Sequence, residues 1–202
     1  RDALTGRAIA FLRARRSAPF YLHLSHYFVH DPIHSRAPWL IEKYAARLPA
    51  GSDPRRAVYA AMVETLAHLV GRLLHALDEL GLAPNTLVVF TSDNGGHPEF
   101  SANGPLRGSK WNVYEGGLRV PWIVRWPGQV RSGATSDAPF IGTDSDIDIE
   151  IETDIVEFDR LIFSWGGDGC RAKSIETSRG FSGSPATPRR FALAGDGGFT
   201  MY

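Results

Sequence analysis

The chain has 202 residues, of which 43% are hydrophobic and 22% are charged, and its formal net charge at pH 7 is +0. This length and composition are typical of a globular domain with a sizeable core. The balanced charge gives no support for a nucleic-acid partner. The single cysteine, Cys170, excludes a disulfide within the chain, and no apolar run predicts a membrane span.

The first part of the chain predicts three helices and one strand. An amphipathic helix is expected over residues 3–15, and a short apolar strand over residues 20–24. The pattern then favours a short helix over residues 39–46. The longest helix is expected over residues 55–80, where apolar side chains recur at helical spacing and Gly81 is a suitable C-cap.

The stretch 87–121 organises the rest of the chain. Its apolar run over residues 87–91 predicts a buried strand that delivers Asp93 and Asn94 just beyond its carboxyl end. Residues 120–125 predict another buried strand. Helix, turn, strand and polar loop in this order favour a parallel sheet of the α/β class, with a ligand site where the strands end.

Asp93 and Asn94 are the sharpest candidates for a binding site. Carboxylate and amide oxygens are hard ligands that suit a divalent cation such as calcium. The glycines that follow allow the backbone to turn sharply. The residues alone leave a second interpretation open, because Asp-Asn-Gly is also a common turn at the end of a strand.

Three motifs then follow one another in a fixed order. They are residues 92–96 (SDNGG), residues 105–110 (PLRGSK) and residues 114–121 (YEGGLRVP). Together they resemble the formylglycine-dependent sulfatases of the alkaline phosphatase superfamily, and the likeness extends back to residue 19 and forward to residue 144. The resemblance implies an alkaline-phosphatase-like α/β fold, with a mixed, largely parallel sheet flanked by helices, here incomplete.

The resemblance also implies roles for individual residues. Asp93 and Asn94 would be ligands of Ca²⁺, and Lys110 and His30 would contact the sulfate and act in catalysis. His97 is a candidate substrate-binding residue near the leaving group. From the residues alone, Lys110 could equally be a solvated loop lysine, and His30 a structural histidine beside an apolar strand.

Sulfatases of this kind use a formylglycine nucleophile, made from a Cys or Ser in a Cys/Ser-x-Pro-x-Arg motif. Cys170 follows the other motifs and lacks the Pro and Arg at the required spacing. We therefore expect the nucleophile to belong to a part of the parent protein that precedes this chain, which begins with Arg1 rather than Met. The chain is expected to be inactive by itself.

The predicted parent activity is calcium-dependent hydrolysis of a sulfate monoester, on either a small molecule or a sulfated glycan. Two alternatives remain: a phosphodiesterase or phosphonate hydrolase of the same superfamily, and a non-catalytic relative that binds sulfated glycans. The sequence determines neither the oligomeric state nor the compartment. A periplasmic, secreted or lysosomal-type compartment would suit the parent.

The character of the sequence changes after residue 144. Residues 145–159 alternate acidic and apolar side chains, which favours a half-exposed strand or a low-complexity acidic tract, and residues 165–202 show no sustained period. We therefore divide the chain into residues 1–144, the C-terminal part of a sulfatase catalytic domain, and residues 145–202, a divergent or unrelated tail of unknown role.

Overall fold

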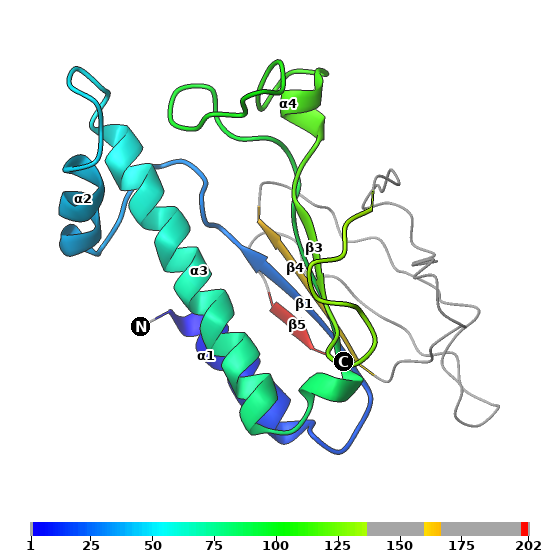
Figure 1. The fold of residues 1–202 in the computed structure, drawn as a ribbon. Helices are drawn as coiled ribbons and strands as arrows, with labels where there is room; N and C mark the ends of the chain where they lie inside the picture. The colour runs from blue at the N-terminus through cyan, green and yellow to red at the C-terminus, as the bar shows by residue number, and fades with distance from the viewer. Residues whose placement is uncertain (1, 137–159, 167–198, 202) are drawn as a thin grey trace.

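Helices and strands alternate along the chain. The computed structural model describes residues 2–136, 160–166 and 199–201. The elements are α1 (Ala3–Ala14), β1 (Phe20–His26), α2 (Pro38–Ala45), α3 (Arg55–Glu79), the short 3-10 helix η1 (Ala83–Asn85), β2 (Leu87–Ser92), α4 (Glu115–Leu118), β3 (Trp122–Arg125), β4 (Arg160–Gly166) and β5 (Phe199–Met201). In Figure 1, α1 and α3 lie against each other beside the sheet, and α2 packs on α3. The predicted α/β class is confirmed.

The five described strands form one mixed sheet in the order β3-β2-β4-β1-β5. The central strand β4 runs parallel to β1 and β2, whereas the edge strands β3 and β5 are antiparallel to their neighbours. Ile162 of β4 is in register with Leu22 of β1 and Val88 of β2. Because β1 and β2 run in the same direction, their carboxyl ends lie at the same end of the sheet. The mixed sheet is as predicted, but its parallel part is limited to the three central strands.

The core forms between the sheet and the α1–α3 pair. Successive side chains of β2 are buried although they point to opposite faces, as in the inner strands of a parallel sheet. Phe11 of α1 packs edge-on against Phe20 of β1, with the ring centroids 5.6 Å apart. Each fully buried leucine contributes about 1.5–3 kcal/mol to stability. The main buried cluster comprises Ala8, Phe11, Leu12, Phe20, Leu22, Leu24, Leu73, Leu77, Leu82, Ala83 and Val88.

The long helix α3 ends as its sequence predicts. Gly81 has a φ of +68°, the left-handed conformation that glycine adopts without a steric cost. Its N–H donates to the carbonyl of Asp78 at 3.0 Å, and the N–H of Leu82 donates to the carbonyl of Leu77 at 2.9 Å. These two bonds satisfy carbonyls of the last helical turn and direct the chain towards β2.

The composition of α3 corrects one expectation. By length and composition alone, α3 could cross a membrane, and it is the one described helix of which this is true. The sequence was expected to contain no such segment. In the fold, Leu73 and Leu77 of α3 belong to the core cluster, and Glu64 bonds to Lys43 and Tyr44 of α2. These contacts place α3 as the covering helix of an α/β sheet.

Strand β3 is less buried than predicted. It lies at the edge of the sheet, and Ile123 is 56% exposed, so the expectation of a buried strand over residues 120–125 is wrong. Strands β4 and β5 come from the region assigned to the tail, and β4 occupies the centre of the sheet. The predicted alternating strand over residues 145–159 lies outside the described residues, and the division at residue 144 stays a prediction.

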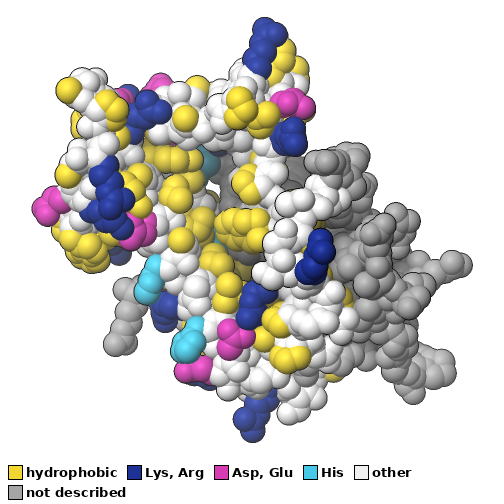
Figure 2. All heavy atoms as spheres, in the orientation of Figure 1, with side chains coloured by type: hydrophobic (Ala, Val, Ile, Leu, Met, Phe, Trp, Pro, Cys, Tyr) yellow, Lys and Arg dark blue, Asp and Glu magenta, His cyan; other side chains and the backbone are white. Residues whose placement is uncertain are grey.

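The surface shown in Figure 2 carries charges of both signs, scattered among apolar side chains. It is hollowed between the side formed by α3 and the loop that carries α4. On the face shown, the described residues form no basic stripe of the kind typical of nucleic-acid-binding surfaces.

Candidate active site

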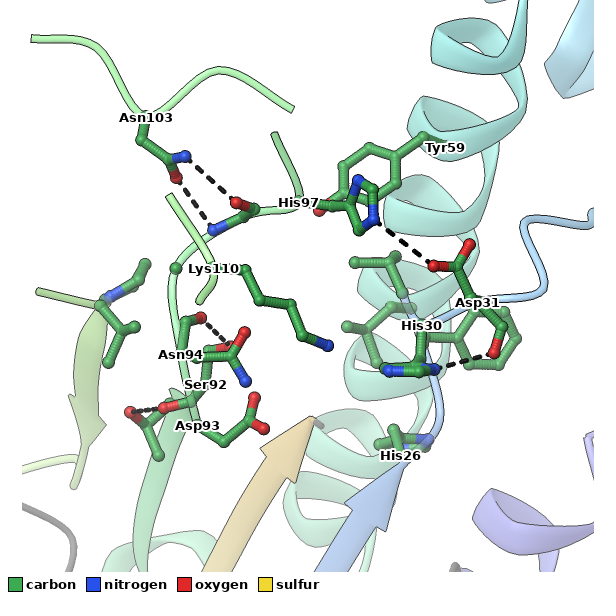
Figure 3. Close-up of a pocket in the computed structure, with 18 of the residues that line it drawn as sticks. His26, His30, Asp31, Tyr59, Ser92, Asp93, Asn94, His97, Asn103 and Lys110 are labelled. Atoms are coloured by element: carbon green, nitrogen blue, oxygen red, sulfur yellow. Dashed lines mark hydrogen bonds and ion pairs between the residues drawn. The ribbon is translucent and has the colours of Figure 1, made fainter. Parts of the chain in front are cut away.

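A cavity of about 260 Å³ lies at the carboxyl ends of β1 and β2. All five predicted site residues line it, although they come from three separate segments of the chain. His30 follows β1, Asp93 and Asn94 follow β2, and His97 and Lys110 lie at the two ends of the next loop. The structure therefore brings together the side chains that the motifs singled out (Figure 3).

Asp93 and Asn94 form a tight turn immediately after β2. The Ser92 hydroxyl donates to the carbonyl of Asn94 at 3.0 Å and holds this turn closed. Burial raises the pKa of the Asp93 carboxyl above its ordinary value, while backbone N–H groups, Lys110 and Asn94 act in the opposite direction. A half-buried carboxylate of this kind is stabilised when a cation approaches it.

Glycines allow the backbones of two loops to touch behind this turn. The N–H of Gly95 donates to the carbonyl of Gly117 at 2.9 Å. A Cβ atom on Gly95 would overlap the backbone of Gly116, and one on Gly116 would overlap the carbonyl of Gly108. These glycines are therefore required by the close approach of the two backbones.

Lys110 is fixed by its backbone and free to extend its side chain into the cavity. Its N–H donates to the carbonyl of Gly96 at 3.1 Å, which places it beside the Asp93–Asn94 turn. Figure 3 shows the ammonium group reaching into the space between Asp93, Asn94 and His30. The next residue, Trp111, has a φ of +73° and is 72% exposed at the rim. An ammonium in this position suits an anion that also touches a cation.

His30 lies across the cavity from this turn, on the loop after β1. Its Nδ1 donates to the carbonyl of Asp31 at 2.8 Å, so the proton on the neutral ring sits on Nδ1. Its neighbour His26, at the end of β1, is 3% exposed, and burial lowers its pKa, partly opposed by Asp2. His26 belongs to the cavity wall.

His97 is held on three sides. Its Nε2 lies 3.5 Å from Oδ2 of Asp31, and its ring stacks on Phe100 with a centroid distance of 4.5 Å. Trp111 meets the same ring edge-on at 4.9 Å. The predicted substrate-binding role of His97 stays a prediction, and Asp31 is a wall residue that the motifs did not indicate.

Two further loop residues have partners within the protein. Asn103 brackets Gly96, accepting from its N–H at 2.9 Å and donating to its carbonyl at 3.2 Å. Arg107 donates to the Tyr114 hydroxyl at 2.9 Å and lies over the same ring. Both side chains therefore shape the loop. Tyr59 of α3 also lines the cavity, and nothing in the apolar pattern of that helix could have identified it.

One serine lies in a segment with the Ser-x-Pro-x-Arg spacing, although the chain was expected to contain no such motif. Ser52-Asp53-Pro54-Arg55-Arg56 fits Ser-x-Pro-x-Arg. The segment forms the turn before α3, where Arg55 pairs with Asp53 at 2.6 Å and with Glu99 at 3.1 Å. Ser52 does not line the cavity, so it is not placed to supply a nucleophile there.

The residues present fit a calcium site in part. Asp93 and Asn94 supply hard oxygen donors, and the carboxyl pKa raised by burial indicates a group that a cation would relieve. Calcium takes six to eight oxygen ligands, roughly, and these two residues supply only some of them. Within residues 2–136, 160–166 and 199–201, no cluster of three or more His, Cys, Asp or Glu side chains is arranged around a metal position.

Comparison with known proteins gives consistent matches. A family model described as Sulfatase matches residues 1–147. Steryl-sulfatase of Mus musculus is 42% identical over 145 residues, which cover 67% of this chain and 22% of that protein. A sulfatase of Formosa agariphila is 38% identical over 154 residues, covering 70% of this chain and 27% of that protein. The chain thus spans about a quarter of the length of these curated relatives.

The fold matches solved structures as well. The crystal structure of Ps i-CgsB in complex with k-i-k-neocarrahexaose superposes with a TM-score of 0.57 and 35% sequence identity. The match covers 65% of this chain and 29% of that chain. The family match over residues 1–147 includes every residue that lines the cavity.

Proposed function

Because this chain belongs to the sulfatase family, we propose that its cavity binds the sulfate group of a sulfate monoester, which the whole protein hydrolyses. The observation that carries the proposal is the convergence of Asp93, Asn94, Lys110 and His30 on one cavity at the ends of β1 and β2. The oxygens of Asp93 and Asn94 can hold a cation beside the Lys110 ammonium and the His30 imidazole. Together these groups are complementary to a bound sulfate.

Lys110 and His30 would act directly on the ester. The Lys110 ammonium neutralises negative charge on a sulfate oxygen, and this charge grows as the ester bond breaks. The Nδ1–H of His30 is engaged with a backbone carbonyl, so its Nε2 is the atom that can exchange a proton with the sulfate or the leaving oxygen. His97 completes the wall of the same site.

Asp93 and Asn94 would hold calcium. When bound, calcium polarises the sulfate and orients it beside the nucleophile. The nucleophile itself is proposed to be a formylglycine outside this chain, so the chain alone binds sulfate esters without turning them over. Residues 160–166 and 199–201, which form β4 and β5, would contribute to the sheet rather than to the chemistry.

Several relatives act on sulfated carbohydrates or steroids by their names, including an N-acetylgalactosamine-6-O-sulfatase of Bacteroides thetaiotaomicron that is 31% identical over 146 residues. We propose a sulfated glycan or a small sulfate ester as substrate. A compact cavity of about 260 Å³ accommodates the sulfate and its first attached group, and leaves the remainder of a larger substrate at the rim.

Binding of phenyl sulfate to the 202-residue chain, measured by NMR or calorimetry with calcium present, tests the proposal. Lys110→Met is expected to weaken binding about tenfold or more, because it removes a charged contact worth about 1.5–3 kcal/mol. Lys43→Met is the matched control, since Lys43 pairs with Glu64 on α3 and does not line the cavity.

Equal affinity of the Lys110→Met and Lys43→Met chains would contradict the assignment. A phosphate diester or a phosphonate monoester carries the same single negative charge as phenyl sulfate. Tighter binding of such an ester than of phenyl sulfate in the same titration would favour the phosphodiesterase or phosphonate hydrolase alternative.

A further inference from the structure

We propose that His97 is a positioning residue for His30, and that it acts through Asp31 rather than by touching the sulfate. This inference rests on the proposed function, because it assigns His30 a direct contact with the ester. It starts from a connected set of contacts: His97 to the Asp31 carboxylate, and the Asp31 carbonyl to His30.

The hydrogen bonds of His97 define which ring nitrogen carries the proton. The backbone N–H of Glu99 donates to Nδ1 of His97 at 3.3 Å, so Nδ1 must be the acceptor. The proton of the neutral ring therefore lies on Nε2, which faces Oδ2 of Asp31 at 3.5 Å. His97 thus presents a donor to Asp31 without needing a positive charge.

The ring of His97 cannot easily rotate away from Asp31. It is stacked on Phe100, which is 6% exposed, and Trp111 meets it edge-on. Arg55 of α3 covers the Phe100 ring, with the guanidinium carbon 4.9 Å from the centroid, and pairs with Glu99. The imidazole is therefore anchored through this packing to the start of a long helix.

Asp31 connects His97 to His30, because its carboxylate contacts one ring and its carbonyl contacts the other. Its side chain is 49% exposed and lies on the loop that follows β1. Its carbonyl accepts from Nδ1 of His30 at 2.8 Å, which fixes the orientation of that ring. Without His97, the Asp31 carbonyl would be less fixed, and the tautomer of His30 would no longer be set.

The test uses the 202-residue chain with ¹⁵N-labelled histidine. The ¹⁵N shifts of His30 are expected to show the Nδ1–H tautomer in the wild type, and a mixture of tautomers in His97→Phe, which keeps the ring stacking but lacks the donor. Phenyl sulfate affinity should fall about three- to tenfold in His97→Phe, the scale of one lost hydrogen bond. His97→Gln retains an N–H donor and should recover much of both properties.

Asp31→Ala is the second variant, and it covers the case in which His97→Phe does not fold. It removes the carboxylate, keeps the backbone carbonyl, and should produce the same mixture of His30 tautomers. His75→Phe is the control, because His75 pairs with Glu79 on the exposed side of α3.

An unchanged His30 tautomer in His97→Phe or in Asp31→Ala would overturn the inference. Failure of the wild-type chain to bind phenyl sulfate would instead contradict the proposed function. The tautomer measurement would still decide the inference in that case, because it needs no ligand.

Discussion

His23 is a buried histidine in the middle of β1. Burial lowers its pKa from the ordinary value of 6.5 to about 4, because the charged ring would lose its hydration. In the unfolded chain the ring takes up its proton near pH 6.5. The fold therefore has its full stability above that pH and loses up to about 3 kcal/mol as the pH falls towards 4. Burial shifts the pKa of His26 in the same direction.

His23→Gln should flatten this pH dependence, because glutamine takes up no proton. Urea unfolding at about pH 7 and about pH 4.5 measures the effect. The wild-type chain is expected to lose more stability between the two conditions than the variant. If both chains lose the same amount, burial of His23 does not contribute to acid sensitivity.

The Asp93 carboxylate lowers the stability of the fold and is also a proposed calcium ligand. Its pKa is raised by burial, so the ionised carboxyl slightly destabilises the fold until a cation arrives. Asp93→Asn removes this charge while keeping the side-chain size. The variant should be at least as stable as the wild type without calcium, and it should lose the rise in thermal midpoint that calcium gives the wild type.

Thermal unfolding with calcium and with a chelator makes this comparison. Asp53→Asn is a suitable control, because Asp53 is paired with Arg55 in the turn before α3. A calcium-induced rise that persists in Asp93→Asn would refute the ligand assignment.

Elements with a strong local pattern could be predicted from sequence. The long helix was expected over residues 55–80 and runs over Arg55–Glu79, with Gly81 in the predicted left-handed conformation. The β2 strand and its Asp93–Asn94 turn were equally readable, because a compact apolar run and a Gly-rich end are local signals.

Features that depend on distant partners could not be read in this way. The exposure of Ile123 follows from the edge position of β3, which only the strand order reveals. The contact of His97 with Asp31 joins two residues that are 66 positions apart in the chain. Residues 160–166 were assigned to the tail of unknown role, yet pairing with two parallel neighbours makes them the central strand.

At the scale of the whole molecule, β4 connects the two strands that carry the site. It pairs with β1 on one side and with β2 on the other, so it fixes the spacing between His30 and Asp93. A chain that ends at residue 136 would leave both inner strands without this partner. Such a chain should lose its single cooperative unfolding transition and its dispersed amide NMR spectrum.

A chain that ends at residue 166 is the matched control. It keeps β4 and removes the edge strand β5 from the described sheet, so it should still unfold in one transition. Cooperative unfolding of the chain that ends at residue 136, equal to that of the full chain, would show that β1 and β2 associate without β4.

The bond between the Lys110 N–H and the Gly96 carbonyl closes the intervening segment, residues 97–109, at its base. Loops whose ends are tied together in this way tolerate insertions and deletions, because a change in contour length does not move the anchors. Residues 104–106 of this segment could therefore change in length or composition while the Lys110 ammonium keeps its position relative to the Asp93–Asn94 turn. Such changes would leave the contacts of His97 with Asp31 and of Asn103 with Gly96 in place.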